Sequence, residues 1–272
     1  MKIIKILINK KQKIFKYCFW LKQARKIKRK LLRRNGHQLS FNKEDRIIVL
    51  VPHSDDEWVG CSTILKMMKH QVYCCYMGYG EVRNSTTLTP KRKLEMQKML
   101  NRYDVNFIDI STNPSKLLED AINEIRPDFI FVPNFIDWHI EHLETINYLY
   151  STLKKINNSS ILATVKIAMY QISVPMKLEQ ITHYCTLSRV DLFSKWINFW
   201  KVYKTQRHLP IVRFLLNEYI NGGIFNCFSA EIFSIFPYSH WNEEFENIDV
   251  DIMKNSDIKN YIDDLEKIRN IL

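Results

Sequence analysis

The sequence predicts an α/β fold with a mostly parallel sheet flanked by helices and a basic N-terminal extension. Short, continuously apolar runs alternate with segments of helical periodicity, and the connections between them are short. Runs rich in β-branched residues, such as RIIVLV at 46–51, are typical of strands buried on both faces of a sheet. A chain of 272 residues with 46% hydrophobic residues can bury one main domain of this class.

The order of the elements follows from these patterns. Strands are expected at 46–51, 72–77, 106–110, 128–132 and 166–172, and helices at 61–70, 91–102, 115–126, 141–156, 191–208 and 256–271. Gly222 and Gly223 are expected to mark a turn. Ligands of such sheets bind outside the carboxyl ends of the strands, so we look for functional residues there.

The positive charge is concentrated at the N-terminus. Residues 1–34 contain fourteen lysines and arginines and no acidic residue, so removing them from the net charge of +11 leaves −3 for the remainder. A basic tail on a mildly acidic body favours an anionic surface as partner, and nucleic acid is not expected. We therefore divide the chain into a basic amphipathic extension, 1–42, and a main domain, 43–272.

Apolar residues recur at roughly helical spacing among the lysines of the extension. This pattern predicts an interfacial helix that attaches to anionic membrane through its lysines and through Phe15, Phe19, Trp20 and Leu21. A solvated or partly disordered basic arm is the alternative interpretation.

Targeting signals and cysteine usage bear on location. No apolar run approaches the ~20 residues that a transmembrane helix needs, and no secretory signal pattern is evident. The six cysteines have no CxxC spacing, so reduced thiols are expected. These features predict a cytoplasmic protein, with peripheral attachment at the inner face of the membrane if the extension docks there.

The segment PHSDDEW stands directly after the first predicted strand. A catalytic zinc ion uses three nitrogen or oxygen ligands from the protein, and His53 and Asp56 can supply two of them from this loop. Asp55 then remains beside the metal as a carboxylate that can act as a general base toward bound water. Taken alone, the acidic run could also be an ordinary helix N-terminus.

A second polar segment, NFIDWHIEH, follows the fourth predicted strand and so opens at the same edge of the sheet. Its two histidines, His139 and His142, are three residues apart and can face one pocket. One can bind zinc while the other protonates a leaving amine or stabilises an oxyanion. Surface histidines would explain this segment alone, but the two segments together predict a metal site.

His-Ser-Asp-Asp-Glu at 53–57 and His-Ile-Glu-His at 139–142 resemble the PIG-L/LmbE-type de-N-acetylases, whose pattern is a His-Pro-Asp-Asp-Glu loop and a His-x-Asp-His loop on a Rossmann-like fold. The resemblance implies His53, Asp56 and His142 as metal ligands, Asp55 as the base and His139 as the second catalytic group. It also implies Zn²⁺, or another divalent transition metal, as cofactor. The implied substrate is an N-acetylated sugar, such as an N-acetylglucosamine-containing glycoconjugate or surface-glycan precursor.

Weaker matches to the family follow in the same order along the chain. They are Gly80-Glu81, the Arg-x-x-Glu element at 92–95 and the segment YKTQ at 203–206, which looks like a Tyr-x-Ser-Gln element. The resemblance implies substrate contacts for Glu81, Arg92 and Tyr203, and Trp58 is a candidate for lining the sugar pocket. Taken alone, Arg92 would be a solvated helix charge, and Tyr203 and Trp58 would be core residues.

Two departures from the family pattern concern residues beside the proposed ligands. Ser54 replaces a proline, which leaves the loop backbone less restricted. Glu141 replaces an aspartate with an expected orienting role, which puts metal affinity in question.

Two other functions compete with hydrolysis. A sugar-binding protein without turnover would share the fold, and substitution of Asp55 separates it from an enzyme. A nucleotide-dependent transferase is disfavoured because no glycine-rich phosphate loop follows the first strand.

Overall fold

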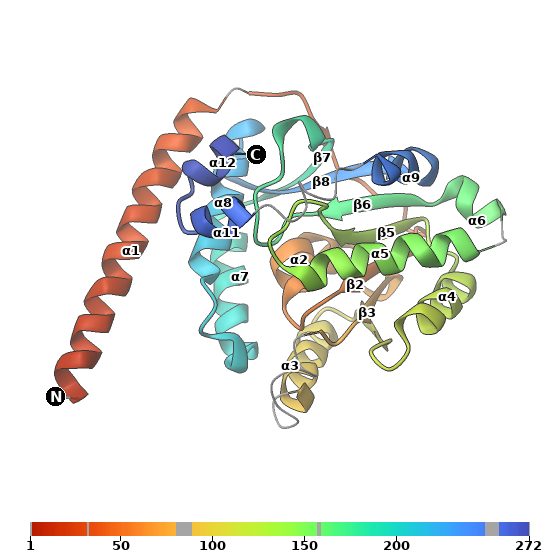
Figure 1. Cartoon of the computed structure of the whole chain (residues 1–272), viewed down its shortest axis with the longest axis horizontal. Coiled ribbons are helices and arrows are strands. Elements are labelled where there is room, and N and C mark those ends of the chain that lie inside the picture. The colour runs from red at the N-terminus through yellow and green to blue at the C-terminus, as the bar shows by residue number, and fades with distance from the viewer. Residues whose placement is uncertain (1, 32, 80–88, 157–158, 248–255, 272) are drawn as a thin grey trace.

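A computed structural model describes the chain except for residues 1, 32, 80–88, 157–158, 248–255 and 272. Its described part forms one sheet with the strand order β1-β7-β8-β6-β5-β2-β3-β4. All neighbouring strands are parallel except for β8, which runs antiparallel to both β6 and β7. Helices flank this sheet (Figure 1), and the predicted α/β class is confirmed.

The strands are β1 (His37–Gln38), β2 (Ile47–Val51), β3 (Val72–Tyr76), β4 (Asn106–Asp109), β5 (Phe129–Pro133), β6 (Lys166–Tyr170), β7 (His183–Leu187) and β8 (Ser229–Pro237). The helices are α1 (Lys2–Lys30), α2 (Asp56–Met68), α3 (Thr89–Asn101), α4 (Pro114–Ile125), α5 (Ile140–Lys155), α6 (Ser159–Thr164), α7 (Arg189–Val202), α8 (Ile211–Ile224), α9 (Tyr238–Glu246), α11 (Ser256–Tyr261) and α12 (Lys267–Ile271). Short 3₁₀ turns are η1 (Lys69–Gln71), η2 (Leu178–Gln180) and η3 (Lys204–Gln206). The five predicted strands correspond to β2 through β6.

Each face of the sheet has its own hydrophobic core. Along β2, Ile47, Val49 and Val51 pack with residues of α2, α3, α7 and α8. The intervening Ile48 and Leu50 pack with residues of α4, α5 and α9 on the opposite face. Because both faces of β2 are buried, each of its side chains gains about 1.5–3 kcal/mol from burial, which explains why the run is continuously apolar.

The position of β2 places two loops side by side. β2 pairs in parallel with both β3 and β5, with Val49 opposite Phe131 of β5. The loop after β2 and the loop after β5 therefore leave the same edge of the sheet at neighbouring positions. These two loops contain the residues that are predicted from the sequence as metal ligands.

The N-terminal extension packs on the body along one stripe of α1. Trp20, Ala24 and Ile27 are buried against Ile220 of α8 and Leu265, and the Trp20 indole donates a hydrogen bond to the Asp263 carbonyl at 2.7 Å. The expectation that Trp20 enters a membrane is therefore wrong, because this side of α1 is its docking face. Figure 1 shows α1 running alongside the helices of the body.

The last part of the extension joins the sheet, because β1 pairs with β7. Residues 37–38 thus belong to the body, although they fall within the extension as we divided it. Across the described residues, no helix has both the length and the apolar character needed to cross a bilayer.

The expected turn at Gly222 and Gly223 is wrong, since both residues lie inside α8. A Cβ atom on Gly222 would lie 2.6 Å from the Ser229 Cα, and one on Gly223 would lie 2.9 Å from the Lys28 carbonyl oxygen. The glycines therefore allow α8 to approach β8 and α1 closely.

Two predicted helices have other bounds in the structure. The helix expected at 256–271 is divided into α11 and α12, and the helix expected at 191–208 ends at Val202.

Replacing Gly222 by alanine tests this close packing. We expect Gly222→Ala to lower the free energy of unfolding by about 1–3 kcal/mol, because the obstructing atoms belong to the backbone of β8. The higher helix propensity of alanine offsets part of this cost. Urea unfolding measures the change, with Lys201→Ala at an exposed position of α7 as the control. Equal stabilities of the two variants would contradict the packing described.

Candidate metal and catalytic site

The loop after β2 is folded around the carboxylate of Asp56. One oxygen of this carboxylate, Oδ2, accepts a hydrogen bond from the His53 backbone N–H at 2.9 Å and lies 3.0 Å from His53 Nδ1. Asp56 is also the first residue of α2, where a negative charge is favoured by the helix dipole. The side chains of both residues are largely buried, with 12% of His53 and 6% of Asp56 exposed.

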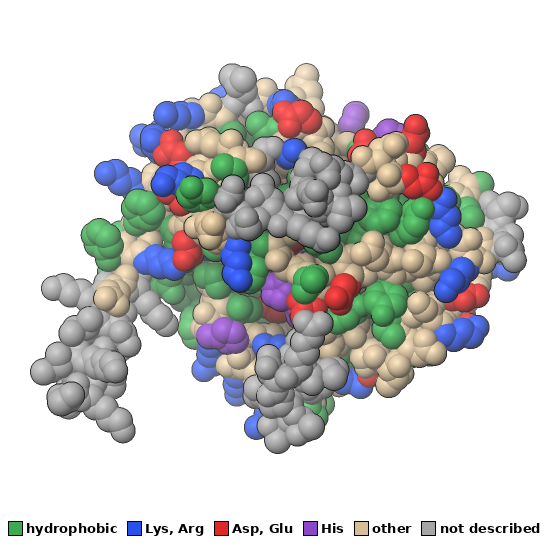
Figure 2. Space-filling model, in the orientation of Figure 1, with side chains coloured by type: hydrophobic (Ala, Val, Ile, Leu, Met, Phe, Trp, Pro, Cys, Tyr) green, Lys and Arg blue, Asp and Glu red, His purple; other side chains and the backbone are tan. Residues whose placement is uncertain are grey.

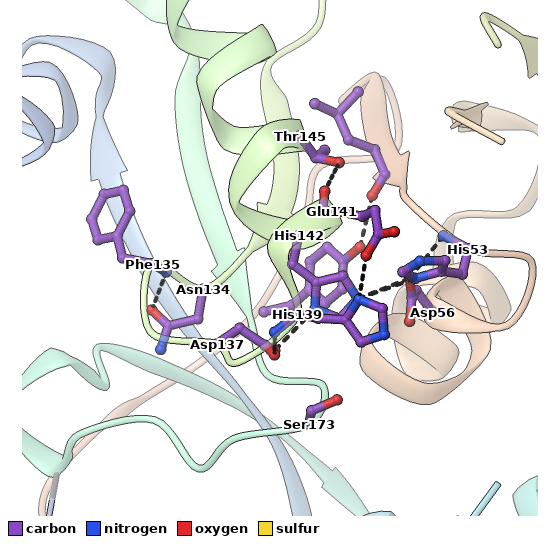
Figure 3. A network of polar contacts seen from close by, with 12 residues as sticks. His53, Asp56, Asn134, Phe135, Asp137, His139, Glu141, His142, Thr145 and Ser173 are labelled. Atoms are coloured by element: carbon purple, nitrogen blue, oxygen red, sulfur yellow. Dashed lines mark hydrogen bonds and ion pairs between the residues drawn. The ribbon is translucent and has the colours of Figure 1, made fainter. Parts of the chain in front are cut away.

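His142, in the first turn of α5, completes a triangle of donor atoms. Its Nε2 lies 3.4 Å from Asp56 Oδ2 and 3.3 Å from His53 Nδ1 (Figure 3). Nitrogen and oxygen ligands of a tetrahedral zinc ion, at 2.0–2.1 Å from the metal, stand about 3.3–3.4 Å apart. The donor atoms of His53, Asp56 and His142 therefore have the spacing of one face of a zinc tetrahedron.

A second donor set is also available, because the ligand atoms of His53, His139 and His142 all lie within 4.8 Å of one another. The set with Asp56 fits one zinc ion better, since its edges of 3.0–3.4 Å match those of a tetrahedron. His139 then remains beside the triangle, with its ring stacked on that of His142 at a centroid distance of 5.0 Å. Its side chain is 33% exposed, so it can reach a bound molecule.

Each histidine of the second loop has its own carboxylate. Asp137 Oδ2 lies 2.9 Å from His142 Nδ1, and Glu141 Oε2 lies 2.6 Å from His139 Nδ1. Such partners fix the orientation of an imidazole and raise its basicity. The orienting role was predicted for Glu141, whereas the role of Asp137 was not predicted from the sequence. The signal for Asp137 was available, since it is an acidic residue in the same short loop as His142.

Charges in the site balance one another. Burial opposes ionisation of Asp56, but His142 and His53 beside it hold the pKa of that carboxyl well below its usual range. Burial also acts against the charged form of His142, yet Asp137 and Asp56 raise its pKa to about 10. The pKa of His139 is lowered by burial and by the two neighbouring histidines. These effects favour the neutral form of the His139 imidazole, whereas Glu141 and Asp56 favour its protonated form.

Asp55 lies next to the triangle and is 4% exposed. Burial, followed by the charge of Asp56, raises the pKa of Asp55 to about 8. A carboxyl group with a pKa in this range can both accept and donate a proton near neutral pH. The structure thus places beside the donor triangle the side chain that the sequence assigns as general base.

The triangle opens into a cavity of about 390 Å³, which is large enough for a sugar. Figure 2 shows histidine and acidic side chains gathered near the centre of the face in view. His53, Asp55, Asp56, His139 and His142 all line this cavity, as does Arg92. Arg92 also donates a hydrogen bond to the Gln206 side chain at 2.7 Å, so its guanidinium is held at the cavity wall.

The weaker motifs meet in space although they are far apart in the sequence. The Glu95 carboxylate accepts hydrogen bonds from the Thr205 backbone N–H at 3.2 Å and from its hydroxyl at 2.5 Å. Together with the bond between Arg92 and Gln206, this contact joins the Arg-x-x-Glu element of α3 to the YKTQ segment. The two segments therefore build one wall of the cavity.

Two residues predicted to contact substrate do not line the cavity. Trp58 is fully buried, stacks on Tyr103 and donates its indole N–H to the Lys195 carbonyl at 3.0 Å. Tyr203 is also fully buried, and its hydroxyl donates to the Glu57 carboxylate. Both side chains support the site from the core. Glu81 lies outside the described residues.

Substitution of Asp137 tests the arrangement of carboxylates. We expect Asp137→Asn to weaken zinc binding by about 10–100-fold, because His142 loses the carboxylate that orients it. Glu141→Gln should weaken it much less, since the carboxylate of Glu141 contacts His139. Competition titrations with a chromophoric chelator measure both affinities. Equal losses in the two variants would place His139 in the ligand set.

Comparison with solved structures identifies proteins with a similar fold. No protein-family model matches the sequence, and a search of curated proteins gives no significant match. Among solved structures, the conserved protein TT1542 from Thermus thermophilus is similar over 70% of this chain and 94% of its own, with 16% identity and a TM-score of 0.56. The A40926 pseudoaglycone deacetylase Dbv21 is similar over 72% of this chain and 98% of its own, with 13% identity and a TM-score of 0.52. A deacetylase of teicoplanin biosynthesis, solved with teicoplanin, covers 70% of this chain and 98% of its own, with 11% identity and a TM-score of 0.51. At these identities the likeness shows a shared fold.

Proposed function

We propose that this chain is a metal-dependent hydrolase that removes the acetyl group from an N-acetylated sugar, with Zn²⁺ or another divalent transition metal held by His53, Asp56 and His142. The observation that carries the proposal is the triangle of three donor atoms with edges of 3.0–3.4 Å, which borders a cavity beside the buried carboxylate of Asp55. Three nitrogen or oxygen ligands with an adjacent carboxylate are the elements that zinc hydrolases use.

The residues around the triangle have distinct roles in this reaction. The cation would supply Lewis acidity toward the acetyl oxygen and lower the pKa of a water molecule that it binds. Asp55 accepts the proton from the attacking water. His139, oriented by Glu141 through Nδ1, keeps Nε2 for the substrate. Asp55 or His139 delivers the proton that the leaving nitrogen needs, and the products are acetate and an amino sugar.

Similarity of fold supports this reaction class, because two of the similar structures are deacetylases. A sugar-binding protein without turnover would need the cavity but would not need Asp55. The function of Asp55 therefore separates the two proposals.

Acetate release and metal content together test the hydrolase proposal. We expect the untagged protein to hold about one zinc ion and to release acetate from at least one of a panel of N-acetylglucosaminides. Asp55→Asn should keep the metal and lose about 10²–10⁴-fold in kcat, because the general base is gone. His142→Ala should lose both metal and activity, whereas Lys201→Ala should change neither.

Three outcomes would contradict parts of this account. An active Asp55→Asn variant would remove Asp55 from the mechanism. Bound zinc with no acetate from any substrate would favour the sugar-binding alternative. Absence of zinc after reconstitution would overturn the ligand assignment.

We also propose that the outer side of α1 binds an anionic membrane surface. Phe15 is 76% exposed and Phe19 is 45% exposed on the side of the helix away from Trp20. Exposed cations follow on the same side at Lys22, Arg25 and Arg29, and no carboxylate of the described residues pairs with them. Aromatic side chains beside unpaired cations are typical of interfacial helices.

Point substitutions test the membrane proposal better than truncation, since α1 is part of the packed body. We expect the double variant Phe15→Ser, Phe19→Ser to bind vesicles of anionic phospholipid at least about tenfold more weakly, because each phenylalanine contributes about 1.5–3 kcal/mol when buried in lipid. Phe193→Ser, at a phenylalanine 61% exposed on α7, is the matched control. Equal vesicle flotation of the double variant and the control would contradict the proposal. Binding of the protein to nucleic acid without binding to vesicles would contradict it as well.

A further inference from the structure

Arg213, in the first turn of α8, is a buried cation that the proposed reaction does not use. It is 3% exposed and lines the cavity that also contains the donor triangle. One nitrogen, Nη1, donates hydrogen bonds to the carbonyl oxygens of Ser173 at 2.9 Å and Ile262 at 3.1 Å. Within the described part of the chain, no hydrogen-bond acceptor contacts its buried Nε or its Nη2. Because Nε is itself enclosed by protein atoms, Nη2 is the nitrogen that is left for a ligand.

The charge of this guanidinium is not neutralised by the protein residues described. No carboxylate among them lies within ion-pair distance of Arg213. The two acidic residues that influence it, Asp263 and Asp137, already have partners, because Asp263 pairs with Lys16 at 2.7 Å and Asp137 with His142 at 2.9 Å. Burial lowers the pKa of Arg213 to about 10, so the group remains charged at neutral pH. A buried charge of this kind is costly unless a counter-ion joins it.

The position of Arg213 relates it to the donor triangle. Ser173, whose carbonyl holds Nη1, lines the same cavity as His142, and both residues are labelled in Figure 3. A molecule with an acetamido group at the triangle would therefore extend toward Arg213 within the same cavity. The free Nη2 offers a charged N–H donor of the kind that binds a carboxylate or a phosphate.

We infer that Arg213 binds an anionic group of the substrate, and that the substrate is an N-acetylated sugar carrying a phosphate or a carboxylate. This inference rests on the proposed function, because it places the acetamido group at the donor triangle. Arg213 is in this account a specificity-determining residue. The anionic group neutralises the buried guanidinium and orients the sugar so that its acetyl carbonyl meets the metal ligands and Asp55.

Substrate preference tests the role of Arg213. Acetate release is measured with N-acetylglucosamine 1-phosphate, N-acetylmuramic acid and the neutral methyl N-acetylglucosaminide. We expect the native protein to prefer one or both acidic sugars. A preference for only one of them shows whether the bound group is a phosphate or a carboxylate. Arg213→Gln should lower kcat/KM for the preferred acidic sugar by about 10–100-fold, mainly through KM, and lower it much less for the neutral sugar. Arg213→Lys should restore part of the preference, since it keeps the charge.

A merely structural role for Arg213 gives a different pattern. If the residue only tethers the Ser173 and Ile262 carbonyls or offsets the charge of Asp137, Arg213→Gln will lower activity equally on all three sugars, and the inference is overturned. Arg207→Gln is the matched control, because Arg207 also donates to a backbone carbonyl, that of Trp200 at 2.7 Å, but is exposed and does not line the cavity.

Failure of the hydrolase proposal is distinguishable from failure of this inference. If no variant releases acetate from any sugar, calorimetric titration with inorganic phosphate tests the anion site without turnover. Binding by the native protein that is lost in Arg213→Gln supports the inference, whereas equal titrations of the two proteins overturn it.

Discussion

The site depends on the contacts that the buried carboxylate of Asp56 makes. This carboxylate accepts from the His53 backbone and lies within 3.4 Å of imidazole nitrogens from both His53 and His142, so it joins the loop after β2 to the start of α5. A carboxylate buried to this extent is stable only with cationic or hydrogen-bonding partners around it. The contacts that stabilise this carboxylate therefore also bring three nitrogen and oxygen atoms of the two loops to a common point.

A second set of polar contacts supports this arrangement from behind. Lys195 is fully buried and donates to Glu218, to Glu231 at 2.7 Å and to the Val59 carbonyl at 2.7 Å. Glu231 of β8 also accepts from the Ser62 hydroxyl at 2.5 Å, so it ties α2 to the sheet. Helix α2 carries Asp56 on its first turn, and its restraint by α7 and β8 keeps that carboxylate in place.

The elements that the sequence predicts well are those whose signal is local. The continuously apolar run of β2 and the His/Asp composition of the loop behind it can be read without knowledge of neighbouring segments. The grouping of His53, Asp56 and His142 follows because parallel strands bring their carboxyl ends to one edge. Long-range features were not predictable in this way. Whether Trp58 and Tyr203 face substrate or core is decided by tertiary packing. The position of Arg213 depends on hydrogen bonds to carbonyl groups 40 and 49 residues away in the sequence. Gly222 looked like a turn because the close approach of β8 leaves no trace in the local sequence.

The central claim is that one metal ion binds to two imidazoles and the Asp56 carboxylate. X-ray absorption spectroscopy of the zinc-loaded protein tests it most directly, because the technique counts imidazole ligands and detects sulfur. We expect two imidazole ligands, with the remaining ligands oxygen, at about 2.0–2.2 Å and without sulfur. Three imidazoles would transfer His139 to the ligand set and contradict the assignment of Asp56, and zinc–sulfur scattering would place the metal at another site altogether.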